Sequence, residues 1–195
     1  MEIKAVFFDI DGTLVNDSRM VLKSTEKAIR ALKEQGIFVG LATGRGPFFV
    51  RPFIERYDFD FAVTYNGQYI FTKDKILSAS PIDKKNLRLL IEYAKKHRIE
   101  IALGTEDGVE GSRIMSFGLS PISQWSARFV PKGFSKAVSQ GFNKVVSKAV
   151  PQDQKQLLQI AQGPVYQVLL LASPKDTQKV EKAFPELKFT RSSPF

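Results

Sequence analysis

The sequence predicts an α/β fold built on a parallel sheet, and three adjacent segments carry this prediction. Residues 5–8 and 37–42 are short apolar runs, typical of strands buried on both faces. Between them, residues 24–35 place apolar side chains at helical spacing, with Ser24 and Thr25 as candidate N-caps and Gly36 as a stop signal. A strand, a helix and a strand at this spacing form a βαβ unit, which implies parallel strands.

Two aspartates, Asp9 and Asp11, stand at the end of the first predicted strand and are followed by Gly12. An aspartate has no packing reason to end a buried strand, and a glycine lets the backbone turn sharply and approach a ligand. Ligands of open α/β sheets bind at the carboxyl edge of the strands. The segment is therefore predicted to bring two carboxylates and a tight loop to that edge.

Two carboxylates at this spacing suit phosphoryl transfer. One can attack phosphorus to form an aspartyl-phosphate, and the second can serve as general acid and then as general base. A pair of carboxylate oxygens also suits Mg²⁺, which binds carboxylates together with substrate phosphates. The alternative is that Asp9 and Asp11 are only turn or cap residues; the apolar strand before them and the Gly12-Thr13 pair after them favour the chemical interpretation.

The second predicted strand ends in Thr43, Gly44 and Arg45. A hydroxyl, a glycine N–H and a guanidinium can together hold a phosphate. The alternative is an ordinary turn with a surface arginine. The position of this group one βα unit after the paired aspartates favours the phosphate site.

A third strand is predicted over residues 61–65, followed by Asn66 and Gly67. Asn-Gly is first of all a hairpin signal, with residues 69–71 and 76–77 as the following strands. Pro47 suits the first turn of a preceding helix, whereas Pro52 is expected to kink or break it.

Residues 7–15, Phe-Phe-Asp-Ile-Asp-Gly-Thr-Leu-Val, resemble the first motif of the haloacid dehalogenase (HAD) superfamily of phosphatases, and the later spacing is similar to its Cof-type branch. The resemblance implies that Asp9 is the nucleophile and Asp11 the general acid/base. It also implies a Mg²⁺ cofactor held by the Asp9 carboxylate and the Asp11 carbonyl. The substrate-binding residues that it implies are Gly12, Thr43, Gly44, Arg45, Asn66 and Gly67.

Residues beyond about 81 mix helices and strands in a way that predicts an α+β layer. By resemblance this layer is the inserted cap of a Cof-type protein, so we expect a core at 1–80, a cap at 81–190 and a return to the core at 191–195. Helices are predicted at 83–96, 122–129, 152–161 and 176–184, and strands at 99–103, 143–150, 165–172 and 187–190.

The lysine motif and the Gly-Asp-x-x-Asn-Asp motif that follow the cap in this family are not present in the sequence. The predicted Rossmann-like core is therefore incomplete at its C-terminal side. The first strand, central in the family, is expected to expose its apolar edge at residues 6–8 and to favour self-association through that edge.

The composition narrows the function classes. The chain of 195 residues has no cysteine and one histidine, which excludes cysteine nucleophiles and leaves no Ser/His/Asp set. No apolar stretch is long enough for a membrane span, so a cytoplasmic location without a membrane partner is expected. The net charge of +9 suits phosphorylated substrates or nucleic acid, but the basic residues are scattered, which favours an ordinary solvated surface.

Three hypotheses follow. The first is a Mg²⁺-dependent phosphatase of small phosphorylated metabolites that works through an aspartyl-phosphate. The second is a truncated, catalytically inactive HAD-like protein whose cap binds a ligand or partner. The third and least favoured is a basic nucleic-acid-binding protein, whose binding would weaken steeply with salt.

Overall fold

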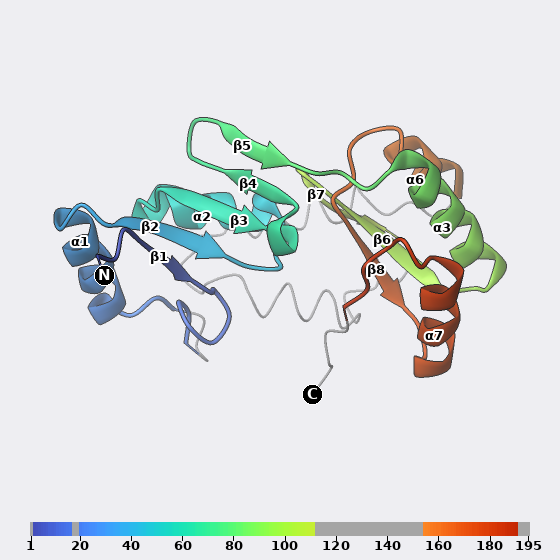
Figure 1. Cartoon of the computed structure of the whole chain (residues 1–195), viewed down its shortest axis with the longest axis horizontal. Coiled ribbons are helices and arrows are strands. Elements are labelled where there is room, and N and C mark those ends of the chain that lie inside the picture. The colour runs from blue at the N-terminus through green and yellow to red at the C-terminus, as the bar shows by residue number, and fades with distance from the viewer. Residues whose placement is uncertain (1, 17–19, 112–153, 191–195) are drawn as a thin grey trace.

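The computed structural model describes residues 2–16, 20–111 and 154–190. These residues form two sheets, one of five strands in the order β1-β2-β3-β4-β5 and one of three strands in the order β7-β6-β8 (Figure 1). Strands β1 (Ala5–Phe8), β2 (Phe38–Ala42) and β3 (Phe61–Thr64) are parallel, whereas β4 (Tyr69–Phe71) and β5 (Ile76–Ala79) are antiparallel to their neighbours. The predicted α/β fold is confirmed.

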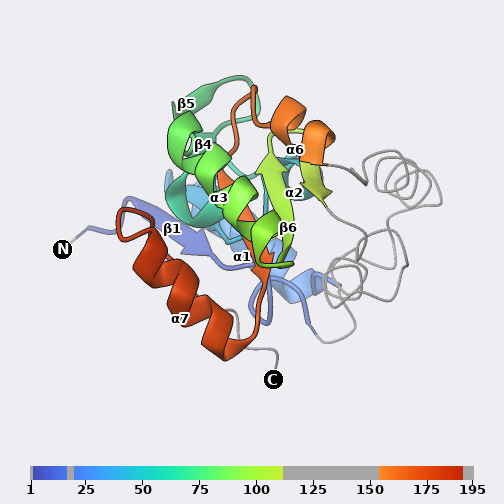
Figure 2. The same cartoon turned by 90° about the vertical axis from the view of Figure 1, so that its right-hand side faces the viewer.

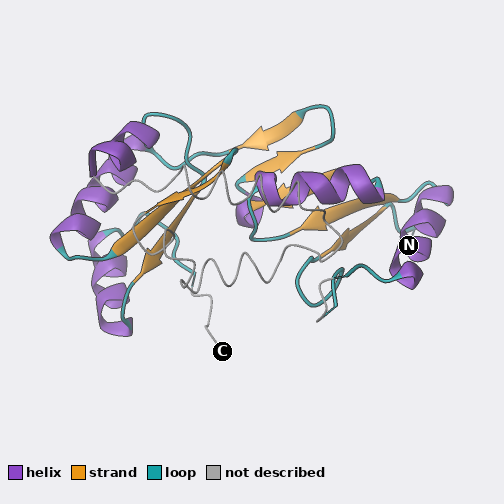
Figure 3. Ribbon diagram, turned by 180° about the vertical axis from the view of Figure 1, so that it is seen from behind, coloured by secondary structure: helices purple, strands orange, loops and turns teal. Residues whose placement is uncertain are grey.

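Helices α1 (Lys23–Glu34) and α2 (Pro47–Tyr57) connect the three parallel strands. Seen from behind, α2 lies across one face of the five-stranded sheet (Figure 3). Its buried side chains, Val50, Phe53 and Ile54, join Val39 and Leu41 of β2 in one apolar cluster. The βαβ connection therefore follows from an apolar helix stripe that the sheet buries.

Three details of the sequence-based prediction were wrong. Helix α1 has Leu22 as its N-cap without a side-chain cap bond, so Ser24 and Thr25 lie inside the first turn. Of the kink or break expected at Pro52, the break does not occur: α2 continues to Tyr57, because the buried residues that follow Pro52 hold the helix on the sheet. Residues 187–190 form no strand; Leu187 and Phe189 pack instead against an apolar cluster of the second sheet.

The second sheet and its helices form an α+β layer. Its elements are α3 (Lys84–Lys96), β6 (Glu100–Thr105), β7 (Gly108–Gly111), α6 (Gln154–Ile160), β8 (Gln167–Leu171) and α7 (Pro174–Ala183). The three helices lie on the side of this sheet that faces away from the five-stranded sheet (Figure 1), and α3 and α7 lie on the side toward the viewer in Figure 2. The predicted helix at 122–129 and strand at 143–150 lie outside the described residues.

Two apolar clusters fill the described part of the molecule, one on the five-stranded sheet and one in the α+β layer. Tyr166, which precedes β8, belongs to the first cluster although its neighbour Val165 belongs to the second. The two layers are therefore in contact at Tyr166. None of the described helices is long and apolar enough to cross a membrane.

Candidate active site

The loop after β1 carries the paired aspartates. The Leu14 N–H donates to the Asp9 carbonyl at 3.0 Å, and the Val15 N–H donates to the Ile10 carbonyl at 3.0 Å. Ile10, Leu14 and Val15 are buried and anchor the loop on the core. Gly12 has φ +75, a left-handed conformation that favours glycine, so the chain reverses directly after Asp11. Local sequence thus fixes both aspartates at the strand end.

The two aspartates differ in their surroundings. The Asp9 side chain is exposed and makes no hydrogen bond or ion pair within the described residues. Asp11 is partly buried, and both of its carboxylate oxygens are bound by Arg45: Nε donates to Oδ2 at 3.0 Å, and a terminal nitrogen donates to Oδ1. One carboxylate is therefore free and the other is held in a fixed orientation.

The second loop begins where β2 ends. The Thr43 N–H donates to the Val63 carbonyl at 2.9 Å, which fixes the loop against β3, and the Thr43 hydroxyl accepts from the Arg45 N–H at 3.2 Å. Thr43 is 9% exposed and Arg45 is 4% exposed. A threonine hydroxyl that accepts a bond keeps its own hydrogen for donation. The loop therefore offers a hydroxyl donor beside the Arg45–Asp11 pair.

The third loop is the turn between β3 and β4. Tyr65, Asn66 and Gly67 all have positive φ, at 49, 55 and 97. Positive φ is uncommon for a bulky residue and persists where surrounding contacts hold it. The Asn66 N–H donates to the Thr43 carbonyl at 3.3 Å, and a Cβ on Gly44 would lie 3.2 Å from Asn66 Oδ1. The turn thus places Asn66 against the second loop.

Two contacts join predicted residues of different loops. Asp11 contacts Arg45, and Asn66 contacts the Thr43–Gly44 segment. Gly12 and Gly67 occupy the reversals of their loops, and Asp9 stands at the end of β1 without a bond to the others. The predicted hairpin at Asn66–Gly67 is confirmed, since Thr64 pairs with Tyr69 across it. The chemical roles of all eight residues stay predictions.

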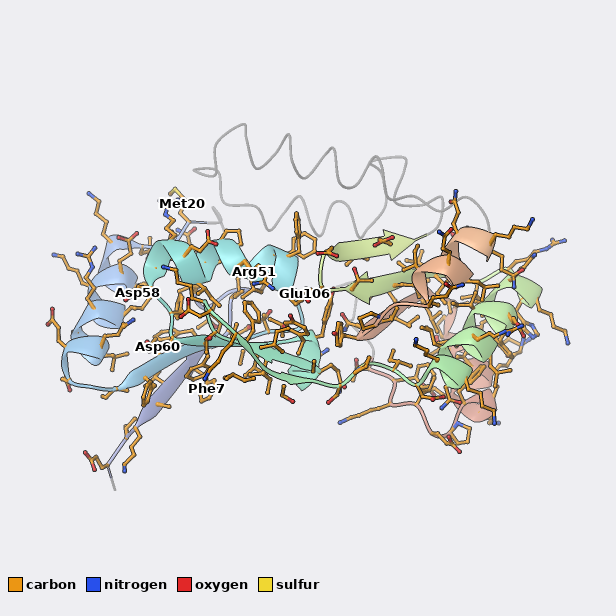
Figure 4. The ribbon with its side chains drawn as sticks, turned by 90° about the horizontal axis from the view of Figure 1, so that it is seen from above. Phe7, Met20, Arg51, Asp58, Asp60 and Glu106 are labelled. Carbon is orange, nitrogen blue, oxygen red and sulfur yellow. The ribbon has the colours of Figure 1, made fainter. Side chains whose placement is uncertain are left out.

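Sequence-based reasoning missed three residues beside this site. Tyr65 is 2% exposed, and Arg51 of α2 pairs with Glu106, which follows β6. Figure 4 shows Arg51 and Glu106 directed toward one another across the junction of the two layers. The contacts of all three residues join positions 40 or more residues apart in sequence, so no local sequence pattern predicts them.

The oxygen atoms at this edge of the sheet are of the ligand type that Mg²⁺ prefers. Asp9 offers a free carboxylate, and the main-chain carbonyl of Asp11 is two residues away. Mg²⁺ is commonly bound by one or two carboxylates together with substrate phosphates and waters. The described ranges contain no group of three or more Asp, Glu, His or Cys residues able to hold a metal. The Asp11 carboxylate itself is taken by Arg45.

Comparison with known proteins agrees with this arrangement. A family model described as haloacid dehalogenase-like hydrolase matches residues 6–195. A putative phosphatase, YkrA, of Bacillus subtilis is 30% identical over 112 residues, which cover 57% of this chain and 44% of that protein. The pyridoxal phosphate phosphatase YbhA of Escherichia coli is 27% identical over 112 residues, which cover 56% of this chain and 41% of that protein.

Solved structures show the same fold. A hypothetical protein from Geobacillus kaustophilus superposes with a TM-score of 0.73 at 27% identity, over 98% of this chain and 66% of that one. The HAD phosphatase BT1666 from Bacteroides thetaiotaomicron gives a TM-score of 0.72 at 22% identity, over 98% of this chain and 64% of that one. The chain thus spans less than half of these two curated relatives and less than two thirds of these solved chains.

The fold and site define an α/β protein that gathers two aspartates, a threonine and an arginine at the carboxyl ends of adjacent parallel strands. The chain belongs to the haloacid dehalogenase-like hydrolase family, in its Cof-type branch. The phosphatases of this family are generally Mg²⁺-dependent.

Proposed function

We propose that this chain carries the nucleophilic and phosphate-binding part of a phosphatase that hydrolyses small phosphorylated metabolites. The observation that carries the proposal is the contrast between the two aspartates: Asp9 is exposed and unbound within the described residues, whereas Arg45 holds both oxygens of Asp11. A nucleophile must be free to approach phosphorus, and an acid/base group must be held in a defined orientation.

The first step is attack by a carboxylate oxygen of Asp9 on phosphorus. A bond forms between that oxygen and phosphorus, and the bond between phosphorus and the leaving oxygen breaks. Asp11 enters this step as the neutral acid and gives its proton to the leaving alcohol, so the carboxylate paired with Arg45 is its form after the step. Arg45 serves here as an orienting residue, because its two donors fix the plane of the Asp11 carboxyl group.

The second step is hydrolysis of the aspartyl-phosphate. Asp11 takes a proton from a water molecule, the water oxygen attacks phosphorus, and the bond between phosphorus and Asp9 breaks. Inorganic phosphate leaves and Asp9 is regenerated. The Thr43 hydroxyl and the Gly44 N–H would donate to phosphoryl oxygens, and Asn66, which lies against Gly44, would border the same site.

Asp9 and the Asp11 carbonyl would hold Mg²⁺, which supplies positive charge against the phosphoryl oxygens when bound. The donors from the described residues are few, so the substrate phosphate and waters would supply the remaining ligands. Binding of the ion is therefore expected to tighten when a phosphate ester is present.

The test is hydrolysis of p-nitrophenyl phosphate and a panel of sugar phosphates, with and without Mg²⁺. Metal-dependent turnover is expected in the wild-type chain and in Asp74→Asn, an exposed aspartate of a distant turn. Asp9→Asn should lose turnover and the phosphoprotein that an acid quench traps. Turnover that survives in Asp9→Asn would contradict the assignment of the nucleophile.

The competing function is that of an inactive relative whose α+β layer binds a ligand or partner. It is favoured by one observation: within the described residues the site has a single unbound carboxylate, that of Asp9. A folded wild-type chain without turnover toward any phosphate ester would support this alternative.

A further inference from the structure

Tyr65 lies where the phosphate-site loops meet the α+β layer. It directly precedes Asn66, and its own N–H donates to the Arg45 carbonyl at 3.0 Å. The side chain is 2% exposed, and its φ of 49 is a conformation that a tyrosine rarely adopts. Such a conformation persists where several contacts hold it together. The contacts of the Tyr65 ring and hydroxyl are therefore expected to be specific.

The hydroxyl of Tyr65 reaches into the α+β layer. It donates to the Thr105 carbonyl at 2.9 Å and lies 3.3 Å from the Gly108 carbonyl. Thr105 ends β6 and Gly108 begins β7, and residues 105–108 are here called the 105–108 turn. Burial raises the pKa of Tyr65, so the phenol keeps its proton and remains a donor. One side chain thus links a loop of the candidate active site to a turn 40 residues away.

Two glycines make room for the Tyr65 ring. A Cβ on Gly46, directly after Arg45, would collide with the hydroxyl, and a Cβ on Gly104 would come within 2.9 Å of the ring. Tyr166 stacks on the other side at 6.3 Å and 15°, and its N–H donates to the Gly104 carbonyl at 2.8 Å. The ring is therefore enclosed by one glycine from each layer and by a second aromatic ring.

A second contact joins the 105–108 turn to helix α2, which lies on the five-stranded sheet. Arg51 of α2 pairs with Glu106 of the 105–108 turn at 2.5 Å (Figure 4). Both side chains are more than a third exposed, at 39% and 37%, so this pair contributes less than the buried hydroxyl of Tyr65. Two independent contacts nonetheless converge on one four-residue turn.

We propose that Tyr65 is a positioning residue that fixes the 105–108 turn beside the phosphate-binding loops and thereby sets which substrates the site accepts. The substrate part rests on the proposed function; the positioning part does not. Tyr65 acts through the turn and takes no part in proton transfer.

The positioning part is tested by the distance between the two layers. Because the chain has no cysteine, spin labels go only to introduced cysteines, and the exposed Lys27 of α1 and Lys85 of α3 are suitable sites. Tyr65→Phe is expected to broaden the distance distribution measured by double electron–electron resonance. Tyr93→Phe, a tyrosine that packs on His97 and Phe184 away from the junction, should leave it unchanged.

Glu106→Ala is the second variant, since the exposure of the Arg51–Glu106 pair means that its loss does not threaten folding. It should give a smaller broadening than Tyr65→Phe, and the double variant a larger one. Circular dichroism checks that each variant is folded. A wild-type distribution in Tyr65→Phe, or in the double variant, overturns the proposal.

The substrate part is tested by kinetics. Tyr65→Phe is expected to lower kcat/KM about fivefold for the sugar phosphate that the wild-type chain hydrolyses best, because KM rises. A change of about fivefold corresponds to the loss of one ordinary hydrogen bond. The kcat for p-nitrophenyl phosphate should stay unchanged, whereas a general loss of folding would lower both. Equal effects on both substrates overturn the substrate part. If the wild-type chain hydrolyses no ester, the proposed function fails, and the distance measurement still decides the positioning role.

Discussion

Arg45 and Asp11 stand at the ends of neighbouring parallel strands, 34 residues apart in sequence, and form a two-point ion pair. The arginine side chain is 3% exposed and that of the aspartate 30%. A buried guanidinium without its partner is costly, because its charge is then neither solvated nor neutralised. The pair therefore stabilises the fold and, at the same time, orients a residue that we assign to proton transfer.

The first prediction separates stability from catalysis at the two aspartates. Asp11→Asn should lower the free energy of unfolding by about 2 kcal/mol, because the buried Arg45 loses its two charge-assisted bonds to the Asp11 carboxylate. Asp9→Asn should change it by less than about 0.5 kcal/mol, because Asp9 is exposed and unbound within the described residues. Urea denaturation of both variants measures the difference. Equal losses in the two would show that the Arg45 contact contributes nothing to stability.

The second prediction concerns the shape of Arg45. Arg45→Lys keeps the positive charge but cannot contact both Asp11 oxygens with a planar fork. We expect kcat to fall about 10- to 100-fold, because a small misplacement of the acid/base group is enough for such a loss. Arg88→Lys is the matched control, since Arg88 pairs with Glu92 on the exposed face of α3. Unchanged turnover in Arg45→Lys would remove the orienting role.

Hydrophobic periodicity predicted β1, α1 and β2, because a buried helix stripe and buried strands leave local patterns. It missed β7, whose sequence Gly108-Val-Glu-Gly111 is short and contains two glycines, which strands disfavour. The structure gives the reason for Gly111: it pairs with Ala102, and a Cβ there would lie against the Ala102 side chain. Close pairing with β6 forms this strand, and no local propensity reveals it.

The residues of the candidate site also fall into two groups, those that the sequence revealed and those that it did not. Asp9, Asp11, Thr43 and Arg45 were identifiable because polar residues at the ends of apolar strands stand out in sequence. The partner of Arg45 was not, and neither was Tyr65, since both depend on contacts over 34 to 43 residues. Contacts of that range follow from the packing of finished elements rather than from any local motif.

The third prediction concerns a charge cluster at the end of α1. Lys33 Nζ contacts Asp58 Oδ2 at 2.6 Å and Asp60 Oδ1 at 3.2 Å, and Asp60 also accepts from the Val39 N–H at 2.7 Å. Figure 4 labels the two aspartates. Lys33→Met should lower the free energy of unfolding by about 1 kcal/mol at neutral pH. Lys27→Met, on the exposed face of the same helix, should have no effect.

The pH dependence gives this cluster a second test. Burial alone would lower the pKa of Lys33, but the hydrogen bonds and charges of Asp58 and Asp60 outweigh it and raise the pKa. A lysine with a raised folded-state pKa stabilises the fold fully below its ordinary value of 10.5. That contribution is lost as the pH rises through the folded-state pKa. The stability gap between wild type and Lys33→Met should therefore close at the alkaline end, and a constant gap would contradict the assignment.

The fourth prediction compares two buried tyrosines. The Tyr69 hydroxyl is buried and makes no hydrogen bond within the described residues, although burial and the nearby Glu106 raise the pKa of Tyr69. Tyr69→Phe should leave stability unchanged or raise it by up to about 1 kcal/mol, because an unsatisfied buried group is removed. Tyr65→Phe should lower it by about 1 kcal/mol, because a formed bond is lost. Thermal and urea unfolding of the pair would reveal a reversed order.

The fifth prediction concerns the outer edge of the five-stranded sheet. Within the described residues β2 is the only strand paired with β1, and each of these strands has an exposed apolar side chain: Phe7 of β1 is 53% exposed and Phe38 of β2 61%. An open strand edge flanked by apolar side chains is a pairing hazard, and lysine on such an edge opposes pairing. We expect the wild-type chain to self-associate with rising concentration, and Phe7→Lys to suppress this in sedimentation velocity. Leu89→Lys, a change of an exposed apolar residue on α3, should not. Equal suppression by both variants would mean that added charge, rather than the β1 edge, governs association.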